Sequence, residues 1–182
     1  ENIEFFKSGV GTPHIINGQF QDLFAVFGGA GSTLSLIIAM LFFCRSKRIT
    51  ELGKLSLIPG IFGINEPIIF GLPMVLNPVM VVPFILTPLF NIVVSYTSMA
   101  MKLVPITNGV TIPWTTPPVI SGFLATDWRG AVLQIVLIIA GVFIYMPFIK
   151  AMDKQYLADE ANAVEVASND DLDLDSLSFD DL

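Results

Sequence analysis

Residues 23–44, LFAVFGGAGSTLSLIIAMLFFC, run for 22 positions without a charged side chain. A helix rises about 1.5 Å per residue, so a run of this length covers the roughly 30 Å hydrocarbon core of a bilayer. Two further runs, at 79–101 and 131–149, are long enough for the same role. Because lipid offers no partner to backbone groups outside a helix or a closed barrel, we expect an all-α membrane protein.

The charges divide the chain into two parts. Only 14% of the residues are charged and the mean hydropathy is +0.73, whereas soluble domains carry about 25% charged residues. Ten of the sixteen acidic residues follow Met152, and residues 1–152 hold six acids against eight Lys or Arg. We therefore expect a membrane-embedded domain at 1–152 and an acidic, disordered cytoplasmic tail at 153–182. The acidic balance excludes nucleic acid as a partner.

The segments between the spans are shorter or broken. Residues 45–54, RSKRITELGK, form a basic loop that belongs in the cytoplasm by the positive-inside bias. A short helix over 49–58 should stop at Pro59-Gly60, and 61–78 contains too much Gly and Pro to span as one helix. Within 79–101, two prolines, Pro83 and Pro88, should kink the helix.

Residues 102–130 are rich in proline and threonine, and their apolar runs are too short to cross the bilayer. Irregular backbone at membrane depth survives only where protein buries it or where it lines a wet cavity. This pattern favours a re-entrant hairpin with its tip near 113–118; an extramembrane loop with interfacial Trp anchors is the alternative. After the last span, Lys150 and Lys154 place the C-terminus in the cytoplasm. Together these segments predict a partial helical bundle with kinked spans.

Glu66 lies in the apolar stretch GINEPIIFGLPMVLNPVM, with no basic residue within ten positions on either side. A carboxylate in hydrocarbon costs about 2.5–3.5 kcal/mol on insertion scales. Either Glu66 caps a helix that begins at Pro67, or it faces a polar functional cavity. For Asp22, at the head of a span, interfacial or capping duty is favoured. His14 suits a structural or solvated role better than a titrating one.

Other chemistries find no support in the sequence. No group of His, Cys, Asp or Glu has metal-ligand spacing, and the GGAGST run lacks the Lys and the strand of a phosphate-binding loop. We expect no metal and no cofactor.

The run GINEP at 63–67, followed by IIFGLP and NPVM, resembles the membrane component (enzyme IIC) of the bacterial phosphotransferase system, in the lactose/cellobiose (diacetylchitobiose) class. Supporting stretches are PHI at 13–15, FGGAGSTLSL at 27–36, NGVTIPWTTPPVISGF at 108–123 and IYMPFI at 144–149. The resemblance covers residues 1 to about 155 and corresponds to the C-terminal half of the family's chains. The family's Gly-x-His-Gly run should lie upstream, and His14 is not its histidine.

The resemblance implies a transport subunit in the bacterial cytoplasmic membrane, with its C-terminus in the cytoplasm. It would bind a β-disaccharide of the cellobiose, chitobiose or lactose type and carry it inward. A IIB partner bearing a phosphocysteine would then phosphorylate the 6-hydroxyl, so the subunit is no enzyme on its own. The full-length protein is expected to form a homodimer. Residues 105–125 match the family's second re-entrant hairpin.

By this resemblance Glu66 is the glutamate of the sugar site, and we expect it to act as general base for the 6-hydroxyl. Further candidates for hydrogen bonding or stacking on the sugar are Asn65, Asn108, Thr111, Trp114 and Thr115. Two rival functions stay open. One is a proton-coupled sugar transporter in which Glu66 carries the proton, and the other is a membrane scaffold whose acidic tail docks a partner.

Overall fold

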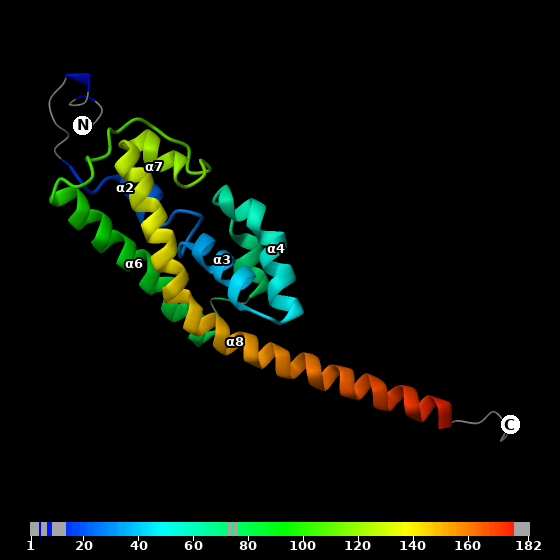
Figure 1. The fold of residues 1–182 in the computed structure, drawn as a ribbon. Helices are drawn as coiled ribbons and strands as arrows, with labels where there is room; N and C mark the ends of the chain where they lie inside the picture. Colours follow the sequence, from blue (N-terminus) through cyan, green and yellow to red (C-terminus); the bar gives the residue numbers. More distant parts are fainter. Residues whose placement is uncertain (1–3, 5–6, 9–13, 73, 75, 177–182) are drawn as a thin grey trace.

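The computed structural model describes residues 4, 7–8, 14–72, 74 and 76–176, with side chains as far as Ala163 (Figure 1). Within this part of the chain every regular secondary-structure element is a helix, as expected. In chain order they are α2 (Gly18–Phe20), the π-helix η1 (Gln21–Ala25), α3 (Thr33–Phe43), α4 (Lys47–Ile61), α5 (Glu66–Gly71), α6 (Pro78–Ala100), α7 (Ile120–Ala125) and α8 (Trp128–Ser176).

The predicted span at 23–44 is wrong as a single helix. The helical conformation stops after Ala25 and resumes at Thr33. Between them Gly28, Gly29 and Gly31 have φ of +72°, +97° and +80°, values that glycine adopts without steric cost. Helix α3, which begins after this break, has 11 residues and is about 16 Å long, roughly half the thickness of a bilayer core.

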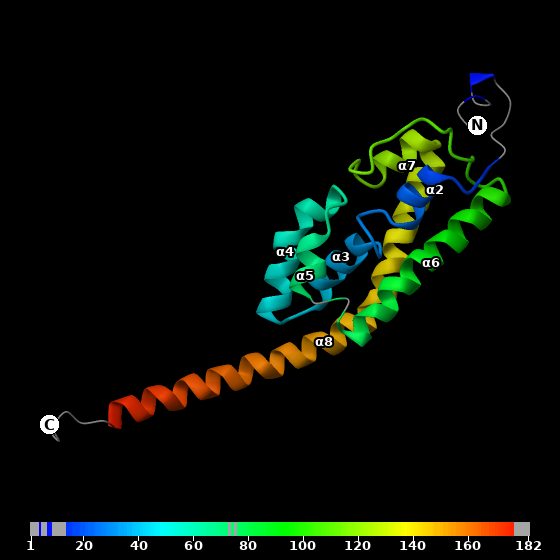
Figure 2. The same cartoon turned by 180° about the vertical axis from the view of Figure 1, so that it is seen from behind.

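Helix α4 contains the helix predicted over 49–58, but it begins earlier, at Lys47, so the loop predicted at 45–54 is wrong from there on. The predicted stop at Pro59-Gly60 is also wrong, because α4 continues through both residues to Ile61. Two glycines let α4 pack closely on α3. A methyl group on Gly60 would overlap the end of the Ile37 side chain, and one on Gly53 would lie 3.2 Å from Leu41. After a turn, α5 runs back along α4 (Figure 2). As predicted, no single helix covers 61–78.

Two helices in the described residues are long and apolar enough to cross a membrane, Pro78–Ala100 and Trp128–Ala163. They match the predicted runs 79–101, which α6 covers up to Ala100, and 131–149, which lies within α8. Helix α6 lies along the first half of α8 (Figures 1 and 2). The kinks expected at Pro83 and Pro88 stay a prediction, since α6 runs as one helix through both prolines.

The structure has helix where the sequence favoured a disordered tail. Helix α8 passes Met152 without a break and reaches Ser176, extending away from the other helices in both views (Figures 1 and 2). Its first turns beyond the predicted span are packed: Met152 is buried, and the Asp153 carboxylate accepts the main-chain N–H groups of Arg45 and Ser46. Residues 177–182 lie outside the described residues.

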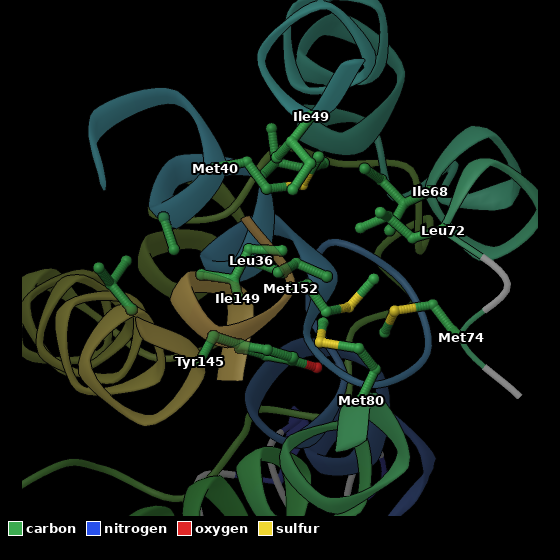
Figure 3. Packing of buried hydrophobic residues seen from close by; sticks show 13 residues of the cluster. Leu36, Met40, Ile49, Ile68, Leu72, Met74, Met80, Tyr145, Ile149 and Met152 are labelled. Carbon is green, nitrogen blue, oxygen red and sulfur yellow. The ribbon is translucent and has the colours of Figure 1, made fainter. Parts of the chain in front are cut away.

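Five helices share one apolar core at the end of the molecule where α3 ends and α6 begins. Figure 3 shows side chains of α3, α4, α5, α6 and α8 meeting there, with Met74, Met80 and Met152 together. A second cluster joins α2 and η1 to the far end of α6, to α7 and to the start of α8. The loop at 26–32 lies between the two cores.

Candidate functional site

The loop at 26–32 is held by side chains from the surrounding helices. Asn65 Nδ2 donates to the main-chain oxygen of Ala30 at 2.9 Å, and the Tyr145 hydroxyl donates to that of Gly31 at 2.6 Å. Backbone that leaves the helix at membrane depth needs such partners. The loop is therefore a built feature of the fold, fixed from the turn before α5 and from α8.

Helix α6 contributes a third anchor. Asn91, fully buried, donates through Nδ2 to Ser32 Oγ at 2.9 Å and to the main-chain oxygen of Ala25 at 3.2 Å. Ser32 Oγ donates to the same Ala25 oxygen at 2.8 Å. These bonds hold the end of η1 and the start of α3 against one face of α6. The two helix ends that flank the loop at 26–32 are therefore both fixed.

The turn before α5 meets the irregular segment before α7. Gly63 has φ of +82°, and a methyl group built on it would lie 3.2 Å from Cε3 of Trp114. Asn65 packs under the glycine loop, because a methyl group on Gly29 would overlap its amide. Three segments, distant in sequence, thus converge on one point.

A cavity of about 240 Å³ opens where these segments converge. It is lined by Asp22, Val26, Gly28, Gly29, Ala30, Gly63, Asn65 and Trp114. Its polar side chains are a carboxylate and an amide, and Trp114 adds a wide aromatic surface that is 61% exposed. Asn65 Nδ2 already donates to the main-chain oxygen of Ala30, and its Oδ1 can accept a hydrogen bond from a ligand. Acceptors beside an aromatic face suit a hydroxylated ligand.

Glu66 does not line this cavity. It follows Asn65 directly and is the first residue of α5, with Pro67 after it. Its side chain is exposed in the described structure, which differs from the buried carboxylate that the apolar surroundings in sequence favoured. The helix begins at Glu66 itself, Asn65 is its N-cap residue, and no side chain makes a capping hydrogen bond there, so the cap by Glu66 of a helix that begins at Pro67 is not seen.

The other predicted site residues lie outside the cavity lining. Asn108 braces the irregular segment against α7: its Nδ2 donates to the Leu124 oxygen at 3.0 Å, and its Oδ1 accepts the N–H of Val110 at 3.0 Å. Thr111 is exposed and Thr115 is half-buried. Of the six predicted residues, the structure places Asn65 and Trp114 together on the cavity.

Asp22 is the lining residue that sequence reasoning missed. Its place at the head of an apolar run favours an interfacial or capping role. The break in that run at Gly28 turns the loop back so that Asp22 and Gly29 border the same cavity. No pattern in the sequence marks this placement, because it depends on the break in the helix. Among the described residues, no three His, Cys, Asp or Glu side chains gather as metal ligands would.

The sequence is similar to that of known proteins from one family. A sequence model described as "Phosphotransferase system, EIIC" matches residues 1–88. The chain is 44% identical over 162 residues to the PTS system oligo-beta-mannoside-specific EIIC component of Bacillus subtilis (strain 168), covering 88% of this chain and 37% of the relative. It is 50% identical over 150 residues to the PTS system cellobiose-specific EIIC component of Geobacillus stearothermophilus, covering 81% and 33%.

The fold is similar to a solved transporter as well. The crystal structure of ChbC, the IIC component from the N,N'-diacetylchitobiose-specific phosphotransferase system, matches with a TM-score of 0.85 at 42% identity. The match covers 88% of this chain and 38% of that one. The chain thus spans a little over a third of the length of the relatives and of the solved structure that it matches.

Proposed function

The chain belongs to the EIIC family of the phosphotransferase system, a family of integral membrane permease components, and from this premise we propose that it supplies part of the sugar site of such a permease. The proposed ligand is a β-disaccharide of the cellobiose, chitobiose or lactose type. The relatives include cellobiose-specific and lactose-specific components, and the similar solved transporter belongs to a diacetylchitobiose-specific system.

The observation that carries this proposal is the cavity between Asp22, Asn65 and Trp114. A pyranose ring presents an apolar face that stacks on an indole and a rim of hydroxyls that donate to carboxylate and amide oxygens. At about 240 Å³ the cavity is slightly smaller than the roughly 300–1,000 Å³ of most small-molecule sites. We assign it to one ring of the disaccharide.

Glu66 is proposed as the general base. It follows Asn65, which lines the cavity, in the sequence, and in this proposal it accepts the proton of the sugar's 6-hydroxyl as that oxygen attacks the phosphorus of a phosphocysteine. The phosphorus–sulfur bond breaks and the thiolate leaves with the electron pair. A positioned base of this kind contributes about 10²- to 10⁴-fold in rate. Asn108, Thr111 and Thr115 stay candidates for the part of the sugar outside the cavity.

The phosphocysteine belongs to a separate IIB component in this proposal, so the chain alone transfers no phosphoryl group. Relatives named as lactose-specific EIICB components, such as that of Staphylococcus aureus (strain N315) at 36% identity over 94% of this chain, support a IIB partner. A homodimer of the full-length protein is part of the same expectation.

We place the end of the molecule that holds the starts of α4 and α6 in the cytoplasm. There Ser46 N donates to Asp153 at 2.9 Å, and Asn77 Nδ2 lies 3.5 Å from Met152 Sδ. Six basic residues lie near this end and favour the inner face of the membrane: Arg45, Lys47, Arg48, Lys54, Lys150 and Lys154. In this proposal the chain then crosses as α6 and α8, and 105–125 forms the re-entrant hairpin.

The test is uptake by the full-length protein in vesicles, with and without the phosphotransferase proteins. The proposal expects phosphorylated disaccharide inside vesicles that contain phosphorylated IIB, and no accumulation when IIB is absent. Accumulation of unmodified sugar driven by a proton gradient alone would contradict it and favour a proton-coupled transporter. Failure of the full-length protein to bind any of these sugars would favour the scaffold.

A further inference from the structure

Two carboxylates of α8 bind the beginning of α4. Asp153 accepts the main-chain N–H groups of Arg45 at 3.0 Å and Ser46 at 2.9 Å. Two turns further along α8, Glu160 accepts the Ser46 hydroxyl at 2.6 Å and the N–H of Arg48 at 3.2 Å. Lys47 N adds a longer bond of 3.4 Å to the same carboxylate.

Within α4 itself, few interactions stabilise its N-terminal end. The first N–H groups of a helix lack partners within it, and the cap from Ser46 Oγ to Ile49 N is long, at 3.5 Å. The first turn contains no acidic residue but does contain Lys47 and Arg48, which the helix dipole disfavours at this end. The negative charge that stabilises the start of α4 is therefore supplied by carboxylates of α8.

An aromatic contact strengthens the same junction. The guanidinium of Arg48 lies 4.8 Å from the ring centroid of Tyr156, which sits between Asp153 and Glu160 on α8. A cation over an aromatic face contributes about 0.5–1 kcal/mol at exposed sites. The junction thus joins side chains spread over two turns of α8 to one turn of α4.

The other end of α4 leads into the candidate sugar site. After Ile61 comes the turn that carries Gly63 and Asn65, both of which line the cavity. Helix α4 has 15 residues and is continuous through Pro59 to Ile61. It is about 22 Å long, and we expect a shift at its start to move this turn. The contact with α3 runs through Gly53 and Gly60 against apolar side chains, which hold α4 sideways without hydrogen bonds.

We propose that Asp153 and Glu160 are positioning residues for the sugar site: by fixing the start of α4 they set the place of the turn at 62–65 opposite Trp114. They touch no sugar and act through the main chain of α4. The identity of the ligand in this inference rests on the proposed function. The effect of Asp153 and Glu160 on the position of the turn rests on geometry alone.

The test uses the full-length protein and the variant Glu160→Gln, which keeps the side chain's size and removes its charge. The matched control is Asp159→Asn, an exposed carboxylate next to it. Asp153→Asn, which is buried, is a second variant if it folds. We expect Glu160→Gln to weaken disaccharide binding by about fivefold or more with the protein still folded, and the control to leave Kd unchanged.

A double-mutant cycle separates positioning from mere stability. If Glu160 acts through Ser46, then Ser46→Ala combined with Glu160→Gln weakens binding little beyond the larger single effect. A structural role alone would lower the melting temperature and leave the Kd of the folded protein unchanged, which would overturn the proposal.

A second readout needs no sugar. Spin labels at Ile64→Cys and Val110→Cys, both exposed positions, report the distance between the turn and the segment that carries Trp114, with Cys44 and other native cysteines replaced. We expect Glu160→Gln to broaden or shift this distance and Asp159→Asn to preserve it. If the wild-type protein binds no disaccharide, the proposed function fails while this distance still decides the positioning role. An unchanged distance in Glu160→Gln overturns it.

Discussion

Gly63 lies directly against Trp114. A methyl group on Gly63 would come within 3.3 Å of the Trp114 main-chain oxygen as well as 3.2 Å of its ring. The turn before α5 and the segment before α7 therefore share one contact, and the cavity lies beside it. Trp114 thus lines the same cavity as Asp22 and Asn65, which can accept hydrogen bonds from hydroxyl groups.

Trp114→Ala should weaken binding of the disaccharide by tenfold or more, because it removes the stacking surface of the cavity; tenfold corresponds to about 1.4 kcal/mol. Trp128→Ala is a matched control, since the two indoles are equally exposed, 61% and 62%, and Trp128 starts α8 away from the cavity. Titration of the full-length proteins with sugar checks this. Equal losses in the two variants would show that Trp114 has no special role.

Glu66→Gln should keep sugar binding within a few-fold of wild type and lower the rate of sugar phosphorylation by about 10²- to 10⁴-fold. The amide still accepts a hydrogen bond and no longer takes up a proton. Single-turnover transfer from phosphorylated IIB to bound sugar measures the chemical step. A wild-type rate in this variant would exclude the role of base.

Much of the fold follows from apolar runs, and the exceptions have local causes. The runs at 79–101 and 131–149 became α6 and α8, because nothing in them forces a non-helical φ. The run at 23–44 is as apolar, but its glycines permit positive φ, and partners such as Asn91 and Tyr145 then satisfy the opened loop. Those partners lie far along the chain, so composition alone could not reveal the break.

The helix beyond Met152 was also not predictable from composition. Its acidic composition favoured disorder, whereas Asp153 and Glu160 have specific partners at the start of α4. Within the site, Asn65 and Trp114 were accessible from motif and chemistry. Asp22 was not, because its place beside Gly29 depends on the break in the helix.

Asn91→Ala should lower the free energy of unfolding by about 1–3 kcal/mol, because a buried main-chain oxygen and a hydroxyl lose a donor. Ser95→Ala is the control: it lies one turn further on the same buried face of α6, and its hydroxyl has no hydrogen-bond partner in the described structure. We expect Ser95→Ala to cost nothing or to stabilise slightly. Thermal unfolding in detergent compares the two, and equal losses would contradict the role given to Asn91.

Stability should depend on pH through Glu160, which lies beyond the predicted span 131–149. Hydrogen bonds from Ser46 and from the main chain of Arg48 lower the pKa of this carboxyl. A carboxyl with a lowered folded-state pKa adds stability above its unfolded pKa and loses it as the pH falls through the folded value. The difference in melting temperature between wild type and Glu160→Gln should therefore shrink in acid. A difference that is constant with pH would contradict this.

The most direct test of the account is a structure of the full-length protein with bound cellobiose or diacetylchitobiose. We expect sugar density in the cavity, with one ring stacked on Trp114, hydroxyls on Asp22 and Asn65, and the 6-hydroxyl within hydrogen-bond distance of Glu66. Sugar bound elsewhere, with this cavity empty and Glu66 remote from every hydroxyl, would contradict it.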